Sequence, residues 1–355
     1  MTPGRPAGRP RVPVIALTGY LGAGKTTLLN HLLRTPGARL GVVINDFGDI
    51  GVDAALVTGE VDEPASVAGG CLCCMPDTGG LETALERLTA ARPDLDAILV
   101  EASGLAEPPN LVRLLRRAAS RRVRYAGLID VVDAVNDART TGAAPPARYG
   151  AATLVVVAKT DLLGADERRQ ALARVTDRAR ARNPRALVVE ADHGRIDPLL
   201  VMDVAHEAAP PGELPLAELT RLARVEAHGG HHHAHADCLT VPAALPVSPG
   251  ALADLLERPP VDAYRLKGVL DVATGGTPGS SDGARRVVVN VVAGQVHLET
   301  ERPARPAEPG LVAIGTRLGD DVRAGLKEAL RPAQEPPPPS DLARLDRIRR
   351  RSRGI

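Results

Sequence analysis

The feature that most constrains this chain is a glycine-containing loop, Gly19 to Thr26, that lies between an apolar run and a helical run. The loop matches the phosphate-binding pattern G-x-x-x-x-G-K-[ST]. Residues 12–17 are β-branched and apolar, which predicts a strand buried on both faces. Residues 26–33 have helical spacing. A strand, such a loop and a helix in this order favour a nucleotide phosphate site over a chance glycine turn.

The residue types in this loop suit an anion. Gly22 and Gly24 let the backbone curl so that successive N–H groups point inward, and the helix adds its positive end. Lys25 is expected to reach the β- and γ-phosphates, and the Thr26 hydroxyl to ligate Mg²⁺. The residues expected to bind the phosphates are Gly19, Gly22, Ala23, Gly24, Lys25, Thr26 and Thr27.

Bulk properties bound the class of protein. The 355 residues suggest about two domains, and the net charge of +1 argues against a polyanion-binding protein as a whole. No stretch approaches the ~18 apolar residues of a membrane span. Residues 1–11 lack the apolar segment of a secretory signal. We therefore predict a cytoplasmic protein with no membrane partner.

Two further loops follow apolar runs. Residues 45–53 contain Asp46 and Asp49, and this acidic loop is either an ordinary turn or a switch loop with a metal-ligating or water-positioning carboxylate. The strand predicted over 97–101 ends at Glu101, and Gly104 follows three residues later. This spacing is typical of an acid that holds Mg²⁺ and a glycine N–H that meets the γ-phosphate.

Three of the four cysteines, Cys71, Cys73 and Cys74, follow a Gly-Gly pair. Thiolates at this spacing can converge on a soft cation such as Zn²⁺ or Cu⁺. Adjacent cysteines point to opposite sides of a strand, so binding by only two thiolates stays open, with a further ligand from the acidic loop. Alternatively, these cysteines are buried small side chains or a redox thiol pair. The density of thiols favours a metal site.

A fourth loop follows the strand predicted to end at Ala158. Residues 158–161 read Ala-Lys-Thr-Asp, close to the Asn-Lys-x-Asp guanine motif. The Asp161 carboxylate is expected to accept from guanine N1–H and the exocyclic amine, and the Lys159 stem to cover the base. Ala158 replaces the motif's asparagine, so a strand followed by a plain charged turn is the alternative.

Strands alternate with helices from residue 12 to about residue 208, which predicts a mostly parallel α/β sheet. All the loops above follow strand carboxyl ends, where open α/β sheets bind ligands. Beyond residue 239 the pattern is that of a smaller α+β domain. The predicted segments are a disordered leader (1–11), a nucleotide-binding domain (12–209), a linker (210–238), the α+β domain (239–331) and a tail (332–355).

The linker and the tail have biased compositions. The linker carries a histidine-rich tract that we expect to gather metal weakly, with His231, His232, His233 and His235 at its centre. The tail combines four prolines, 336–339, with six arginines. It is predicted to project as a linker and a short basic helix. A solvated tail is the commoner outcome for such a segment, and nucleic-acid or ribosome contact the rarer one.

These motifs together resemble the CobW-type GTPases, P-loop metallochaperones related to the nickel-insertion GTPases of urease and hydrogenase. The resemblance covers residues 12 to about 330, and Gly70 to Cys74 is its most specific part. It implies a P-loop GTPase domain with a mostly parallel sheet and a smaller α+β C-terminal domain. It further implies GTP and Mg²⁺ as cofactors and Zn²⁺ or Co²⁺ at the three cysteines, assisted by Asp46 or Asp49.

The predicted function is GTP hydrolysis coupled to delivery of a metal to a client metalloprotein. We expect Lys25, Glu101 and Asp49 to act in hydrolysis. The rivals are a non-enzymatic zinc buffer or stress regulator, in which the histidine tract matters most, and a small-molecule kinase. The kinase would leave the cysteines and residues 158–161 unexplained. The sequence is compatible with a monomer or a homodimer.

Overall fold

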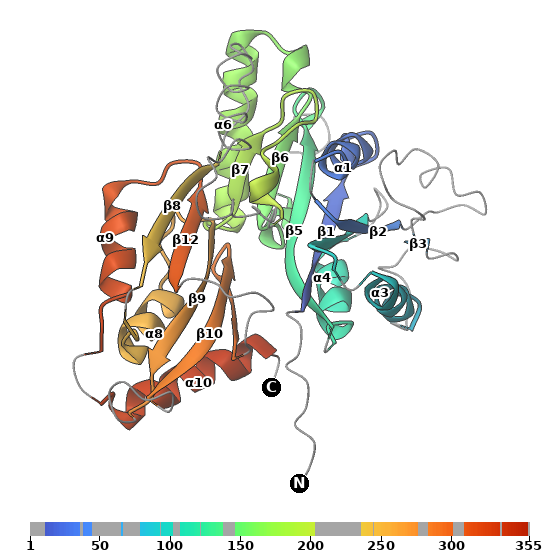
Figure 1. Ribbon diagram of the computed structural model, residues 1–355. Coiled ribbons are helices and arrows are strands. Elements are labelled where there is room, and N and C mark those ends of the chain that lie inside the picture. The colour runs from blue at the N-terminus through green and yellow to red at the C-terminus, as the bar shows by residue number, and fades with distance from the viewer. Residues whose placement is uncertain are drawn as a thin grey trace, which may run out of the picture.

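The computed structural model describes most of the chain. Its described residues are 11–35, 38–44, 65–66, 79–92, 94–101, 107–120, 122–137, 146–202, 236–243, 245–275, 283–300, 309–333 and 336–353. They form two domains that lie side by side, each with its own sheet (Figure 1). In this part of the chain no helix is long and apolar enough to cross a membrane.

The first domain is a parallel sheet with strand order β3-β2-β4-β1-β5-β6-β7. Its strands are β1 (Val12–Gly19), β2 (Leu40–Ile44), β3 (Ala65–Ser66), β4 (Ala97–Glu101), β5 (Val123–Asp133), β6 (Leu154–Ala158) and β7 (Leu187–Glu190). Its helices are α1 (Lys25–Leu33), α3 (Gly79–Ala91), α4 (Pro108–Arg117) and α6 (Ala165–Arg182), with the 3-10 turns η2 (Ala147–Gly150), η3 (Thr160–Leu162) and η4 (Pro198–Leu200). The predicted α/β class is confirmed.

Apolar side chains on both faces explain why this sheet is covered on both sides. Along β1, Val14 and Ala16 pack into one core, whereas Ile15 and Leu17 pack into the other, because successive residues of a strand alternate. Helices α3, α4 and α6 supply the first core. The second contains α1 together with residues of the second domain. Parallel pairing puts every strand's carboxyl end at one edge, where the predicted loops begin.

The second domain is an antiparallel sheet with order β11-β10-β9-β12-β8. Its elements are β8 (Asp237–Pro242), α8 (Pro249–Glu257), β9 (Arg265–Ala273), β10 (Ala284–Val292), β11 (Gln295–Glu299), β12 (Gly310–Gly315), α9 (Asp320–Ala329) and α10 (Pro339–Arg353). Apolar residues of all three helices pack into the core on one face of this sheet. The predicted α+β class is confirmed.

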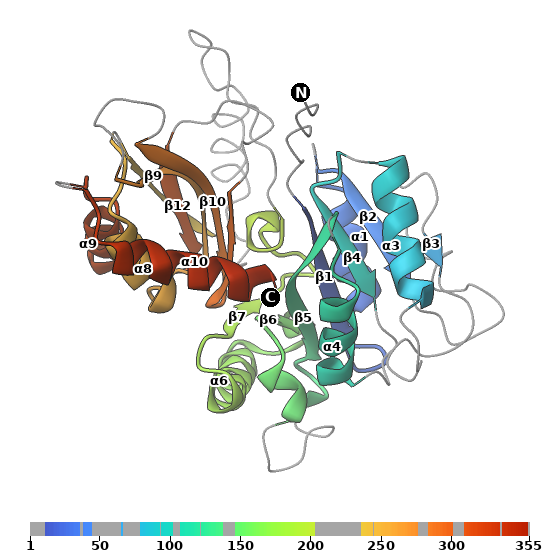
Figure 2. The same cartoon turned by 90° about the horizontal axis from the view of Figure 1, so that it is seen from below.

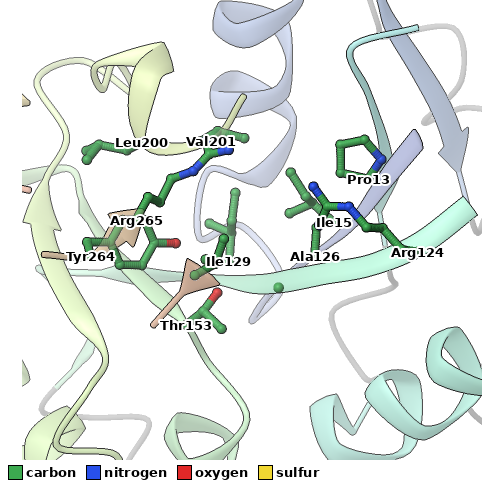
Figure 3. Close-up of a pocket in the computed structure, with 12 residues that line it drawn as sticks. Pro13, Ile15, Arg124, Ala126, Ile129, Thr153, Leu200, Val201, Tyr264 and Arg265 are labelled. Atoms are coloured by element: carbon green, nitrogen blue, oxygen red, sulfur yellow. The ribbon is translucent and has the colours of Figure 1, made fainter. Parts of the chain in front are cut away.

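The domains share a packed interface. Tyr264, Val292 and Ile314 of the second domain belong to the core around α1. Arg265 Nη1 donates to the carbonyl of Leu199 at 3.2 Å. A cavity of only about 10 Å³ remains where Arg265 and Tyr264 approach β1 and β5 (Figure 3), which is room for about one water molecule. The two domains are therefore in close contact.

The C-terminal segment differs from the prediction of a projecting basic tail. A basic helix does form, but α10 lies across the second domain against α8 and β11 (Figure 2). Leu345 is fully buried in the core, and Arg344 pairs with Glu257 and Asp254 of α8. An apolar stripe among the arginines, which includes Leu345 and Ile348, explains why the helix packs against the domain.

The domain junction contains a histidine that is expected to make stability pH-dependent. His297, half-buried on β11, faces Arg11, Arg116 and Arg124 of the first domain. Burial, and then the charges of these arginines, lower the pKa of His297 to about 3 from the ordinary 6.5. Below about pH 6.5 the unfolded chain binds a proton that the folded chain excludes until its own, lower pKa is reached. Stability is therefore lost as the pH falls through this window.

We accordingly expect the free energy of unfolding to fall as the pH is lowered from about 6.5 to about 3, by at most about 1.4 kcal/mol per pH unit from this group. Replacing His297 with Gln should flatten that part of the decline. Denaturant titrations at several pH values measure it, with the same change at the exposed His193 as the matched control. An unchanged pH slope in His297→Gln would contradict the assignment.

Candidate functional site

The phosphate loop has the geometry that its glycines predict. Gly22 and Gly24 have φ values of 73° and 106°, which are left-handed conformations that glycine adopts without strain. Gly19 has a φ of 153°, and a β-carbon there would lie 2.6 Å from the carbonyl oxygen of Val131. Gly24 caps α1 without a side-chain hydrogen bond, and the first turn of α1 has no acidic residue. The positive end of α1 is thus suited to an anion.

Lys25 lies within this loop. Its side chain is buried, and Nζ donates to the carbonyl oxygens of Gly19 at 3.1 Å and Tyr20 at 3.3 Å. These contacts hold the ammonium group inside the curve of the loop, beside the N-terminus of α1. A positive charge in this position can neutralise phosphate oxygens that the backbone N–H groups bind.

Thr26 and Glu101 come together although 75 residues separate them. Glu101 ends β4, which pairs with β1. Its carboxylate is buried, and Oε1 accepts from Thr26 Oγ1 at 3.4 Å. A hydroxyl and a carboxylate are hard oxygen donors of the kind that Mg²⁺ takes beside a nucleotide. The donors that the sequence singled out therefore fit Mg²⁺ in chemistry and in proximity.

The predicted guanine motif, residues 158–161, begins where β6 ends and is called the base loop below. Lys159 has a φ of 60°, an unusual conformation for a side-chain-bearing residue, and its Nζ donates to Asp133 Oδ2 at 2.7 Å. Burial raises the pKa of Asp133, but hydrogen bonds from Lys159 and Asn136 outweigh it and hold the pKa below its ordinary value. Asp133 stays ionised and keeps Lys159 in place. The loop adjoins the phosphate loop, because a β-carbon at Gly24 would lie 3.7 Å from Cβ of Ala158.

Another loop, which none of the sequence motifs includes, contacts both the phosphate loop and the base loop. It follows β7 and includes His193 and Gly194, with φ values of 50° and 75°. A β-carbon at Gly194 would lie 2.6 Å from Cγ2 of Thr27, so this loop packs closely on the start of α1. His193 Nδ1 lies 3.3 Å from Asp161 Oδ2, the carboxylate predicted to read guanine. Because this loop follows the carboxyl end of β7, its position in the sequence indicates that it belongs to the ligand-binding edge of the sheet.

Comparison with known proteins identifies the family. A profile described as "CobW/HypB/UreG, nucleotide-binding domain" matches residues 13–190, and one described as "Cobalamin synthesis protein cobW C-terminal domain" matches residues 237–333. A zinc chaperone CobW from a Sinorhizobium species is 30% identical over 90% of this chain and 98% of the relative. The chain belongs to the CobW/HypB/UreG family.

Two other relatives align with a shorter part of the chain. The zinc chaperone CobW of Pseudomonas aeruginosa is 35% identical over 54% of this chain. A zinc-regulated GTPase metalloprotein activator of Schizosaccharomyces pombe is 32% identical over 52% of this chain. These alignments span 59% and 47% of the two relatives' lengths. Helix α10, Pro339–Arg353, lies beyond both CobW family profiles.

Ten of the predicted site residues lie outside the described residues. They are Asp46, Asp49, Cys71, Cys73, Cys74, Gly104, His231, His232, His233 and His235. In the described ranges no group of three or more His, Cys, Asp or Glu side chains forms a metal cluster. Ile44, the last residue of β2, pairs in register with Glu101 of β4 and with Ser66 of β3. In the sequence, residues 45 and 67 follow the ends of β2 and β3.

Proposed function

We propose that this chain is a GTP-hydrolysing metallochaperone that binds Zn²⁺, or next Co²⁺, and delivers it to a client metalloprotein. The observation that carries the proposal is that groups from the ends of three parallel strands meet at one edge of the sheet. The phosphate loop after β1 holds Lys25, Thr26 in it contacts Glu101 at the end of β4, and Gly24 adjoins Ala158 at the end of β6. Membership of a family of nucleotide-binding domains supports the nucleotide. The relatives named as zinc chaperones support the metal.

The phosphate loop would hold the β- and γ-phosphates. Backbone N–H groups from Gly22 to Thr26 would donate to the phosphate oxygens. The Lys25 ammonium group would exchange its contacts with the loop carbonyls for contacts with these oxygens and neutralise their charge. Thr26 and Glu101 would hold Mg²⁺, which supplies charge neutralisation of the β- and γ-oxygens. Asp49 is proposed to orient the attacking water, and the Gly104 N–H to meet the γ-phosphate. Catalysis then consists of positioning and charge stabilisation.

The base loop would select guanine. Asp161 accepts from guanine N1–H and the exocyclic amine, a donor pair that adenine lacks, while the stem of Lys159 covers the ring. The 2.7 Å contact between Lys159 and Asp133 orients that stem before nucleotide arrives. Adenine would offer this carboxylate no such donor pair, so its binding would lack two hydrogen bonds that guanine makes.

The transported metal would bind Cys71, Cys73 and Cys74, with Asp46 or Asp49 completing the site, because thiolates suit Zn²⁺ at about 2.3 Å. The chain enters these segments from β2 and β3, at the sheet edge where Glu101 ends β4. A switch loop and a thiolate site that start there can both respond to the γ-phosphate. The histidines at 231–233 and 235 would gather metal for this site.

The testing experiment measures GTP affinity at controlled free Zn²⁺ and Co²⁺, together with the metal content of the purified protein. Coupled sites must act reciprocally, so Zn²⁺ should strengthen GTP binding by the same factor by which GTP strengthens Zn²⁺ binding. ATP serves as the matched nucleotide. A GTP affinity that is the same at all free Zn²⁺ and Co²⁺ concentrations would contradict the coupling. Zinc binding without hydrolysis in the presence of Mg²⁺ would favour a zinc buffer, and hydrolysis only with an added acceptor would favour a kinase.

A further inference from the structure

A buried ion pair lies against the phosphate loop, in parts of the chain to which the phosphate-binding motif does not extend. Asp130 on β5 is fully buried, and Arg148 in η2 is 8% exposed. The guanidinium donates from Nε to Oδ2 at 2.9 Å and from Nη2 to Oδ1 at 2.7 Å. A two-point pair of this kind fixes the orientation of both groups.

The pair contacts the residues on both sides of Gly19, at which β1 turns into the loop. On one side, Thr18 Oγ1 donates to Asp130 Oδ1 at 2.8 Å. On the other side, the ring of Tyr20 lies over the guanidinium of Arg148, with 4.2 Å between the ring centroid and Cζ. The start of the phosphate loop is therefore held from two directions by one ion pair.

Tyr20 links this pair to the group expected to bind phosphate. Its carbonyl oxygen accepts from Lys25 Nζ at 3.3 Å and from the Ala23 N–H at 3.1 Å. Burial raises the pKa of the Asp130 carboxyl, and the charges of Arg148 and Lys25 oppose that rise. Because the Tyr20 carbonyl accepts from Lys25, any shift of Tyr20 would move a group that orients the lysine.

The surroundings of Tyr20 make the contact with Arg148 important. A cavity of about 130 Å³ adjoins the loop here, and its lining includes Tyr20, Leu21, Arg148 and Tyr149. The ring of Tyr20 is not enclosed, since the residue is 41% exposed. With open space beside it, the stacking contact with the guanidinium restricts the positions that the ring can take.

We propose that Arg148 and Tyr20 are positioning residues for the phosphate loop: the Asp130–Arg148 pair holds the Tyr20 ring, and the ring holds the loop in its anion-binding shape. The inference rests on the proposed function, because it assigns both residues to the nucleotide site. A loop that is held in shape binds phosphate without first losing conformational freedom, whereas a loosened loop binds more weakly. The ligand is the phosphate part of a nucleoside di- or triphosphate.

The test compares Tyr20→Leu with Tyr20→Phe in the full chain. Tyr20→Leu removes the ring and should weaken GTP and GDP binding about three- to tenfold. Tyr20→Phe keeps the ring face and should bind within about twofold of the wild type. Nucleotide dissociation constants come from fluorescence titration, and kcat and KM of hydrolysis are measured beside them. The loss should appear chiefly in KM.

Arg148→Lys provides the second arm, since lysine keeps the charge but loses the planar two-point geometry and should weaken nucleotide binding about tenfold. Its matched control is Arg286→Lys, because Arg286 pairs with Asp271 at two points, both 2.8 Å, in the second domain. Thermal unfolding without nucleotide records any loss of stability. The Tyr20→Leu, Arg148→Lys double variant should lose less affinity than the product of the two single losses.

The outcomes separate the two proposals. If the wild type binds neither GTP nor GDP, the proposed function fails and the positioning role fails with it. If the wild type binds nucleotide and Tyr20→Leu binds it equally well, the positioning role alone is overturned. Lower melting temperatures with unchanged affinities in both single variants would make the ion pair a purely structural contact and overturn the role as well.

Discussion

Replacing Lys25 with alanine should reduce GTP hydrolysis by at least about a hundredfold, the usual cost of removing one charge-stabilising group from a transition state. Lys25 Nζ lies within the phosphate loop at 3.1 Å from the Gly19 carbonyl, so its loss removes the positive charge nearest the expected phosphates. Zinc binding should persist, since the predicted thiolate ligands do not include Lys25. Phosphate release with GTP and zinc titration of the same sample measure the two properties.

The matched control for this change is Lys327→Ala, which alters an exposed lysine on α9 in the other domain. It should hydrolyse GTP at the wild-type rate. Undiminished hydrolysis in Lys25→Ala would show that the phosphate loop is not the catalytic site. Loss of zinc binding in that variant would show that the two sites are not separable as proposed.

The second large effect is expected from the double change Cys73→Ser, Cys74→Ser. It removes two of the three predicted thiolates, and a serine hydroxyl is a poor ligand for a soft cation. Zinc affinity should fall by more than the ~10- to 100-fold that changes outside the direct ligands cost. GTP binding without zinc should stay at the wild-type level. Competition titration with a zinc indicator measures the first, and nucleotide titration in chelator the second.

The remaining cysteine offers the control. Cys238 lies on β8, is exposed and is not among the predicted ligands, so Cys238→Ser should keep the wild-type zinc affinity. If the double variant keeps its zinc affinity, the thiolate site is wrong. The histidines from His231 to His235 would then be the binding residues, and their replacement should abolish zinc binding.

Local patterns were enough to predict most of the fold. Helical spacing in the sequence predicts one helix over residues 165–182 and another over residues 249–257, and α6 and α8 have these bounds. The parallel sheet followed from buried β-branched runs that alternate with helices. The contact between Thr26 and Glu101 could be anticipated, because both follow the carboxyl ends of strands and such ends meet at one edge.

Features that depend on tertiary contacts could not be predicted in this way. Arg148 is one arginine among many in the sequence, and nothing local indicates that it pairs with a fully buried Asp130. The packing of α10 was missed because Leu345 lies among arginines that suggested a solvated helix. Gly194 was missed because its role depends on contact with Thr27, more than a hundred residues earlier.

One face of the first sheet has a consequence for how the molecule melts. A parallel sheet needs both faces covered, and here Tyr264, Val292 and Ile314 complete the cover beside α1. The second domain is thus part of the first domain's core, and neither half can unfold without exposing apolar surface of the other. We infer a single cooperative unit. A nucleotide that binds only at the phosphate loop would then protect the distant antiparallel sheet against unfolding as much as its own domain.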